Sequence, residues 1–245
     1  MSETHPAAGT CPLDHAALRD PNGCPVSAGA AAFDPFGDGY QQNPPEYLRW
    51  ARAQEPVFFA PQIGYWVVTR YDDIKAVFRD HETFDASVAL ERMTPVTPQV
   101  LDILAGYDYG MQRTMVNEVE PAHMARRRAL IEPFTPAALK ALEPMVRRVA
   151  RQYVDRFIDD GRADLVEKMF WEAPLTVGLH FLGVEEDDMA LLRQYSVAHT
   201  VNIWGRPTPQ EQVEVAHAVG NFWQLSGRIV EKMRATPDGP GWMRY

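Results

Sequence analysis

One short segment of the sequence combines side chains that can bind an anion. It runs from residue 120 to 136 and reads Glu-Pro-Ala-His-Met-Ala-Arg-Arg-Arg-Ala-Leu-Ile-Glu-Pro-Phe-Thr-Pro. In a helix, His123 and Arg127 lie four residues apart on one face, which also carries Leu130 and Phe134. An arginine keeps its charge, so an arginine that faces a core needs an anion beside it. That anion is either a carboxylate of the protein, the commoner case for such spacing, or a bound ligand.

Other catalytic and metal-binding signatures are missing from the sequence. There is no glycine-rich phosphate loop, no paired His-Glu zinc motif, no Gly-x-Ser-x-Gly elbow and no Cys-x-x-Cys pair. The seven histidines are scattered, and His180, in an apolar segment, is more simply explained as a hydrogen-bonded core residue than as a metal ligand. We therefore assign no metal ligand.

The composition describes an acidic globular protein. The 24 Lys and Arg residues against 33 Asp and Glu residues give a formal net charge of −9, which opposes a general role in binding nucleic acid. Hydrophobic residues make up 46% of the chain, enough for a sizeable core. Cys11 and Cys24 are too few for a disulfide scaffold. The sequence shows neither a secretory signal nor an apolar run long enough to span a membrane, so we expect a cytoplasmic protein.

The elements that would position the anion-binding segment are mostly helical. Residues 1–32 are rich in Ala, Gly, Pro and Ser, and we expect a flexible lead-in there. Residues 87–117 form a long irregular connection, a kind of loop that often contributes to a binding site. Periodicity predicts two short paired strands at 57–59 and 65–69, and helices at 44–51, 72–78, 142–157, 169–182 and 210–234. The expected fold class is mainly α with a small β-hairpin region.

The segment Pro-x-His-x-x-x-Arg, followed by Arg-Ala-Leu-Ile-Glu-Pro-Phe-Thr-Pro, resembles the C helix of bacterial cytochromes P450. Neighbouring segments agree in order. Residues 64–74 resemble the first hairpin strand and B helix of that family, residues 87–117 its B to C connection, and residues 181–188 the end of its E helix and the start of its F helix. The resemblance covers residues 33–235. It implies the N-terminal half of the cytochrome P450 fold, roughly helices A to G, with residues 33–245 as a partial haem domain.

The resemblance also implies roles for individual residues. His123 and Arg127 would hold a haem propionate, so the ligand anion is preferred to the protein carboxylate. Substrate-pocket candidates come from the B to C connection and from the region near the F to G turn, although ordinary loop packing explains any single one equally well. They are Val88, Leu90, Tyr107, Met111, His199, Val201 and Trp204.

The family's later motifs are absent from this sequence. It contains neither the I helix with its acidic residue and threonine nor the Phe-x-x-Gly-x-x-x-Cys-x-Gly loop that supplies the axial thiolate. Neither Cys11 nor Cys24 has the surroundings of that ligand. We therefore expect a chain truncated before the I helix, with no catalytic residue of its own and inactive alone.

The implied function is that of a haem-dependent monooxygenase, which inserts one atom of dioxygen into a small organic substrate. The run Gly-Cys-Pro-Val-Ser at residues 23–27 and the segments 204–207 and 239–243 resemble the self-sufficient branch, in which a fused reductase with FMN and a 2Fe-2S cluster passes on electrons from NAD(P)H. The alternative is a non-enzymatic helical module that binds an organic anion or a protein partner through Arg127 and His123.

Overall fold

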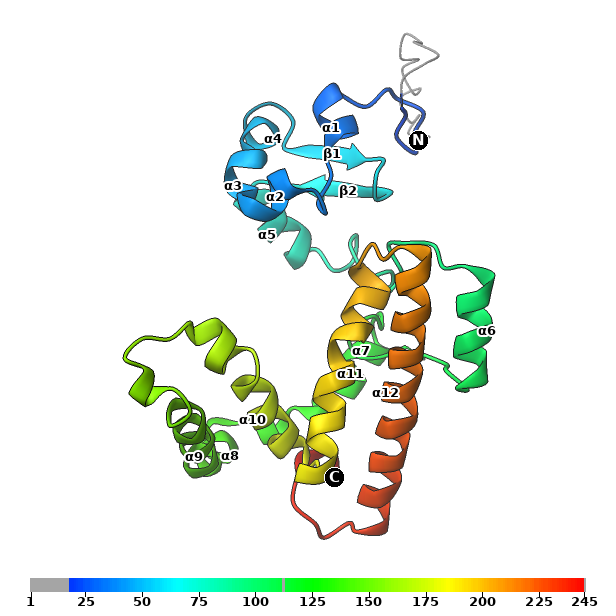
Figure 1. Cartoon of the computed structure of the whole chain (residues 1–245). Helices are drawn as coiled ribbons and strands as arrows, with labels where there is room; N and C mark the ends of the chain where they lie inside the picture. Colours follow the sequence, from blue (N-terminus) through cyan, green and yellow to red (C-terminus); the bar gives the residue numbers. More distant parts are fainter. Residues whose placement is uncertain (1–17, 112, 245) are drawn as a thin grey trace, which may run out of the picture. The chain divides into compact units, whose positions relative to one another are not determined.

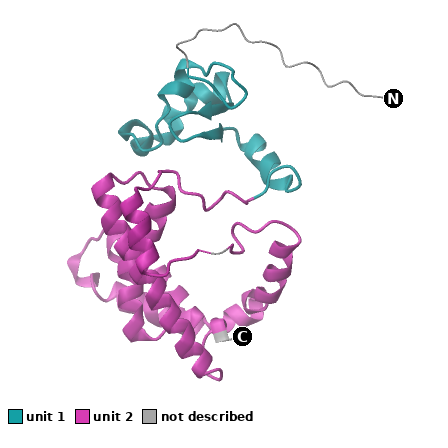
Figure 2. Cartoon of the chain, turned by 90° about the vertical axis from the view of Figure 1, so that its right-hand side faces the viewer, with its two compact units in different colours: residues 1–85 teal, residues 86–245 magenta. Residues whose placement is uncertain are grey.

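The computed structural model describes residues 18–111 and 113–244, and the chain divides into two compact units, Met1–Asp85 and Ala86–Tyr245 (Figure 2). Cys11 and the first 17 residues of the expected lead-in lie outside the described residues. Within the described part of the chain, none of the helices combines the length and the hydrophobicity that a membrane crossing requires.

The first unit places short helices around one antiparallel hairpin (Figure 1). Strands β1 (Val57–Ala60) and β2 (Tyr65–Val68) pair from Val57 opposite Val68 to Ala60 opposite Tyr65, which confirms the two predicted strands. Gly64, with a φ of +72°, occupies the left-handed conformation that the connecting turn requires. The helices are α1 (Ala28–Ala32), α2 (Asp38–Gln42), α3 (Pro44–Tyr47), α4 (Arg49–Gln54) and α5 (Tyr71–Arg79).

Part of the expected flexible lead-in is folded. The hydroxyl of Ser27 accepts a hydrogen bond from the amide of Ala30 and caps α1. Ala30 is fully buried, in a cluster with Phe33 and Phe58. Composition suggested a loose segment, but small residues such as alanine also allow close packing, and here they bring α1 against the core of the first unit.

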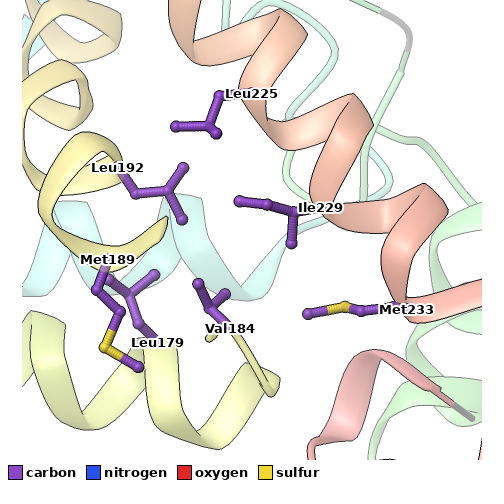
Figure 3. Packing of buried hydrophobic residues seen from close by; sticks show 7 residues of the cluster. All are labelled: Leu179, Val184, Met189, Leu192, Leu225, Ile229 and Met233. Atoms are coloured by element: carbon purple, nitrogen blue, oxygen red, sulfur yellow. The ribbon is translucent and has the colours of Figure 1, made fainter. Parts of the chain in front are cut away.

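The second unit is built from helices around a long antiparallel pair (Figure 1). Its helices are α6 (Pro98–Gly106), α7 (Ala122–Leu130), α8 (Pro136–Ala141), α9 (Glu143–Val154), α10 (Ala173–Leu182), α11 (Glu186–Trp204) and α12 (Pro209–Ala235). Shorter turns lie at η1 (Glu132–Phe134), η2 (Ile158–Asp160), η3 (Val166–Phe170) and η4 (Trp242–Arg244). Its largest core cluster joins α10, α11 and α12 through Leu179, Leu192, Leu225 and Ile229 (Figure 3).

Three further predicted segments differ from the structure. The helix predicted at 44–51 is divided at Leu48 into α3 and α4. The connection at 87–117 contains α6, which begins after the cap residue Thr97 and buries Val100 and Leu104, so tertiary packing supports a helix whose periodicity is weak. The helix predicted at 169–182 starts only at Ala173, after the π-helical turn η3. Gly183 ends α10 in a left-handed conformation, as predicted.

Candidate functional site

Helix α7 carries the predicted anion-binding pair. The helix begins directly after Pro121, and the carboxylate of Glu120 accepts a hydrogen bond from the amide of Met124 in its first turn. The second oxygen of Glu120 lies 2.9 Å from Nδ1 of His123, whose side chain is partly exposed. This contact orients the imidazole and leaves its Nε2 as the nitrogen that can reach a ligand.

The three consecutive arginines of α7 differ in their partners. Arg126 forms two hydrogen bonds of 2.7 Å with the carboxylate of Glu118, and these bonds hold the pKa of that carboxyl below its ordinary value. Arg127 and Arg128 are exposed and form no ion pair among the described residues. Arg127, four residues after His123 on the same helix, is therefore an unpaired cation on the face that carries the histidine.

Arg127 does not face a core within the described part of the chain. Helix α7 contains no buried residue, and Ile131 just beyond it is 54% exposed. Phe134, on the same predicted face, is half-exposed and packs with its ring against Phe181 and Trp242, at centroid distances of 5.2 and 5.3 Å. Periodicity placed these side chains on one face correctly, but most of that face has no cover in the described part of the chain.

A cavity of about 520 Å³ lies between the start of the B to C connection, α6 and the end of α11. Two of the seven predicted pocket residues, Leu90 and Met111, line this cavity. The chain segments around it are joined by hydrogen bonds: Nε1 of Trp204 donates to the carbonyl of Ala89 at 3.1 Å, and the amide of Met93 donates to the carbonyl of Ile203 at 2.8 Å. The end of α11 is thus fixed against the connection.

The other predicted pocket residues lie outside the lining of this cavity. Val88 is exposed, and Val201 accepts the hydrogen bond of the Gly205 amide that ends α11. The hydroxyl of Tyr107 lies 3.1 Å from Nδ1 of His217 on α12, and the ring of His199 lies 6.3 Å from that of Phe222. Ordinary packing explains these positions in the present structure.

Four polar residues that line the cavity were not predicted from the sequence: Glu91, Arg92, Tyr109 and Asn202. Nε of Arg92 donates to Oδ1 of Asn202 at 3.3 Å. Burial raises the pKa of the Tyr109 hydroxyl, and burial together with the charge of Arg92 lowers the pKa of the nearby His199. No local signal marks these residues, because Arg92 and Asn202 are separated by 110 positions in the sequence.

Comparison with known proteins gives one consistent result. The chain is 63% identical to an intact type IV self-sufficient cytochrome P450 monooxygenase, with a TM-score of 0.86 over 95% of this chain and 30% of that one. It is 57% identical to the haem domain of a cytochrome P450 from Acinetobacter radioresistens, with a TM-score of 0.82 over 88% of this chain and 52% of that one. Cytochrome P450 130 of Mycobacterium tuberculosis is 29% identical over 200 residues, 80% of this chain and 47% of the relative.

The chain resembles about half of a cytochrome P450 haem domain. It also spans about half the length of the curated relatives it matches. No family model matches it. The predicted fold class is confirmed, since the mostly helical structure with one small hairpin superposes on cytochrome P450 structures. These relatives do not favour the alternative of a non-enzymatic binding module.

The polar side chains of α7 suit the propionate groups of a haem. In a cytochrome P450 the haem iron is held by a cysteine thiolate. Cys24 lies in the first unit, before α1, and among the described residues no cluster of three or more His, Cys, Asp or Glu can hold a metal. An unpaired guanidinium and an imidazole one helical turn apart do match a propionate carboxylate. The two side chains of α7 thus suit a carboxylate such as a propionate, and Cys24 belongs to the other compact unit of the chain.

Proposed function

We propose that this chain forms the N-terminal half of the haem domain of a monooxygenase, in which His123 and Arg127 bind a haem propionate. The observation that carries the proposal is the exposure of Arg127 and its lack of an ion pair among the described residues. Arg126 beside it, by contrast, is occupied by Glu118. A propionate would give Arg127 the anionic partner that it lacks among residues 18–111 and 113–244.

The chemistry of the two side chains suits a carboxylate. The guanidinium presents a planar fork of N–H donors that can bind both oxygens of one carboxylate. Nδ1 of His123 already faces the carboxylate of Glu120, so Nε2 is the nitrogen that donates to a propionate. The imidazole must carry both ring protons to make the two contacts together. Glu120 is therefore a positioning residue that orients His123.

For the whole protein, the function is insertion of one oxygen atom of dioxygen into an organic substrate, with the second atom released as water. The bound haem supplies the iron at which dioxygen is activated. The two electrons come from NAD(P)H through a reductase partner, fused in the same chain and carrying FMN and a 2Fe-2S cluster. The 63% identity with an intact self-sufficient cytochrome P450 supports this arrangement. The residues of α6 and the end of α11 wall the substrate cavity.

Haem titration of the 245-residue chain tests the propionate contact. The probes are hemin and hemin dimethyl ester, which differ only in their two carboxylates. Arg127→Gln should weaken hemin binding by about tenfold or more, because a hydrogen bond to a charged group contributes about 1.5–3 kcal/mol. Binding of the dimethyl ester should change little. The measurement is the absorbance of the haem as a function of chain concentration.

Arg128→Gln is the matched control, since Arg128 is an exposed arginine of the same helix and has no ion pair with any residue that the structure describes. It should leave the affinity for both probes unchanged. Equal losses for hemin and its diester, or equal losses in the Arg127 and Arg128 variants, would contradict the assignment.

A further inference from the structure

The cavity beside α6 has an apolar wall and a polar end. Leu101 and Leu104 of α6, with Ile203 near the end of α11, provide apolar surface. Arg92 and Asn202 provide polar surface in the same cavity. A volume of about 520 Å³ is in the range of small-molecule sites, and an apolar wall with few polar groups is typical of them.

Two hydrogen-bond donors of this cavity are buried without a partner. The hydroxyl of Tyr109 and Nδ2 of Asn202 are shielded from solvent, and neither has a hydrogen-bond partner among the described residues. Oδ1 of Asn202 is occupied by Nε of Arg92, at 3.3 Å, so the amide orientation follows from that contact. Buried polar groups without partners destabilise a fold, and such groups are rare in native structures. A ligand that accepts hydrogen bonds would satisfy both.

Arg92 is the cation that lines this end of the cavity. Arg92 is only partly buried, its one hydrogen bond to a described residue is that to Asn202, and it forms no ion pair in the described part of the chain. One carboxylate, that of Glu91, also lines the cavity, but Glu91 is exposed and water screens its charge. Burial raises the pKa of Tyr109 and keeps its hydroxyl protonated, while His199 nearby has a lowered pKa and stays neutral near pH 7. Besides the exposed carboxylate of Glu91, the cavity therefore offers one partly buried cation and two neutral donors.

We propose that this cavity binds an organic carboxylate with an apolar body, its carboxylate against Arg92, Tyr109 and Asn202 and its body along α6. The inference rests on the proposed function, since it names the substrate class of the same protein. The guanidinium of Arg92 is only partly buried, whereas the donors of Tyr109 and Asn202 are shielded from solvent and must become accessible before the ligand can pair with them. A neutral apolar molecule would leave the cation and both donors without partners.

The experiment compares 2-naphthoate with its uncharged methyl ester, using the haem-free 245-residue chain. Both probes carry the same aromatic body, and their affinities are measured by isothermal titration calorimetry. Arg92→Gln should weaken 2-naphthoate by about tenfold or more, as expected for loss of a charge-assisted hydrogen bond, and change the ester by less than about twofold. Tyr109→Phe, which removes only a hydroxyl, should weaken 2-naphthoate several-fold.

Arg228→Gln on α12 is the control, since Arg228 is exposed and forms no ion pair in the described chain. It should leave both affinities unchanged. Circular dichroism shows whether each variant folds. If Arg92→Gln does not fold, the comparison of acid and ester in Tyr109→Phe provides the test. The proposal is overturned if the folded parent chain shows no one-to-one binding of 2-naphthoate, or if the Arg92 or Tyr109 variant weakens acid and ester alike.

The two proposals fail separately. Hemin binding that depends on Arg127, together with no preference for 2-naphthoate over its ester, overturns only the carboxylate site. Binding of 2-naphthoate that depends on Arg92, together with hemin binding that does not depend on Arg127, overturns only the propionate contact.

Discussion

Helix α12 contains two glycines whose replacement by alanine should have different effects on stability. Both Gly220 and Gly227 lie in the interior of Pro209–Ala235, where alanine stabilises a helix by about 1 kcal/mol relative to glycine. A Cβ added at Gly227 meets no atom within 4 Å. Gly227→Ala should therefore raise the free energy of unfolding by about 1 kcal/mol.

Gly220 is different because the ring of Tyr107 packs directly on it. A Cβ there would lie 2.3 Å from Cγ and Cδ2 of the ring, closer than real Cβ contacts allow. The ring is held by the contact of its hydroxyl with His217, at 3.1 Å, and cannot move without losing it. Overpacking costs about 1–3 kcal/mol, so after the helix gain Gly220→Ala should lower stability by about 0–2 kcal/mol.

Urea unfolding followed by far-ultraviolet circular dichroism measures the comparison. The helix-propensity gain is common to both variants, so the difference between them, about 1–3 kcal/mol, reports the clash with Tyr107 alone. The penalty should disappear when Gly220→Ala is made in a Tyr107→Ala background, relative to Tyr107→Ala itself. If Gly220→Ala stabilised the chain as much as Gly227→Ala, the close contact between the Tyr107 ring and Gly220 of α12 would be refuted.

Two further pairs of variants test the packing and the helix capping of the second unit. Leu192→Ala should cost about 2–5 kcal/mol in urea unfolding because Leu192 is 6% exposed in the core, whereas Leu191→Ala, at a position 42% exposed, should cost less than about 1 kcal/mol. Thr208→Ala, which removes the capping box of α12, should cost about 1 kcal/mol. Hydrogen bonds from Thr208 lower the pKa of Glu211 below its ordinary value of 4.5. The ionised carboxylate therefore stabilises the fold at pH values above 4.5. That stabilisation is lost as the pH falls through the lower folded pKa, and Glu211→Gln and the parent should converge in stability there.

Much of the fold was predictable because short-range patterns decide it. Branched and aromatic residues on either side of a Pro and Gly turn give the hairpin β1–β2, and the apolar spacing of α9 places Val149 and Tyr153 in the core as expected. Helix α6 was harder, because its weak periodicity is supplemented by contacts with α12 that only the tertiary structure provides. For the hairpin and α9, local sequence preference and tertiary packing favour the same structure. For α6, tertiary packing decides.

The anion-binding pair was predictable only in part. The sequence places His123 and Arg127 one turn apart on a helix, and the structure has that helix. Periodicity shows which side chains share a face but not what covers that face. In the described chain the cover is incomplete, so Arg127 is exposed rather than turned into a core. Its contact with a haem propionate stays a prediction that depends on the resemblance and on the lack of an ion pair with the described residues.

The polar end of the cavity could not be predicted, and the reason is physical. An arginine in a loop is usually solvated, and an asparagine within a helix carries no signal of its own. Arg92 and Asn202 become a unit only because Trp204 and Ile203 bond to the chain around them and bring the end of α11 against the connection. Tyr109 packs its ring against Trp223 of α12, at a centroid distance of 5.4 Å, and its hydroxyl and Nδ2 of Asn202 are shielded from solvent without a partner among the described residues. Their unpaired donors are thus a consequence of folding, and a ligand that pairs with them would stabilise the arrangement that created them.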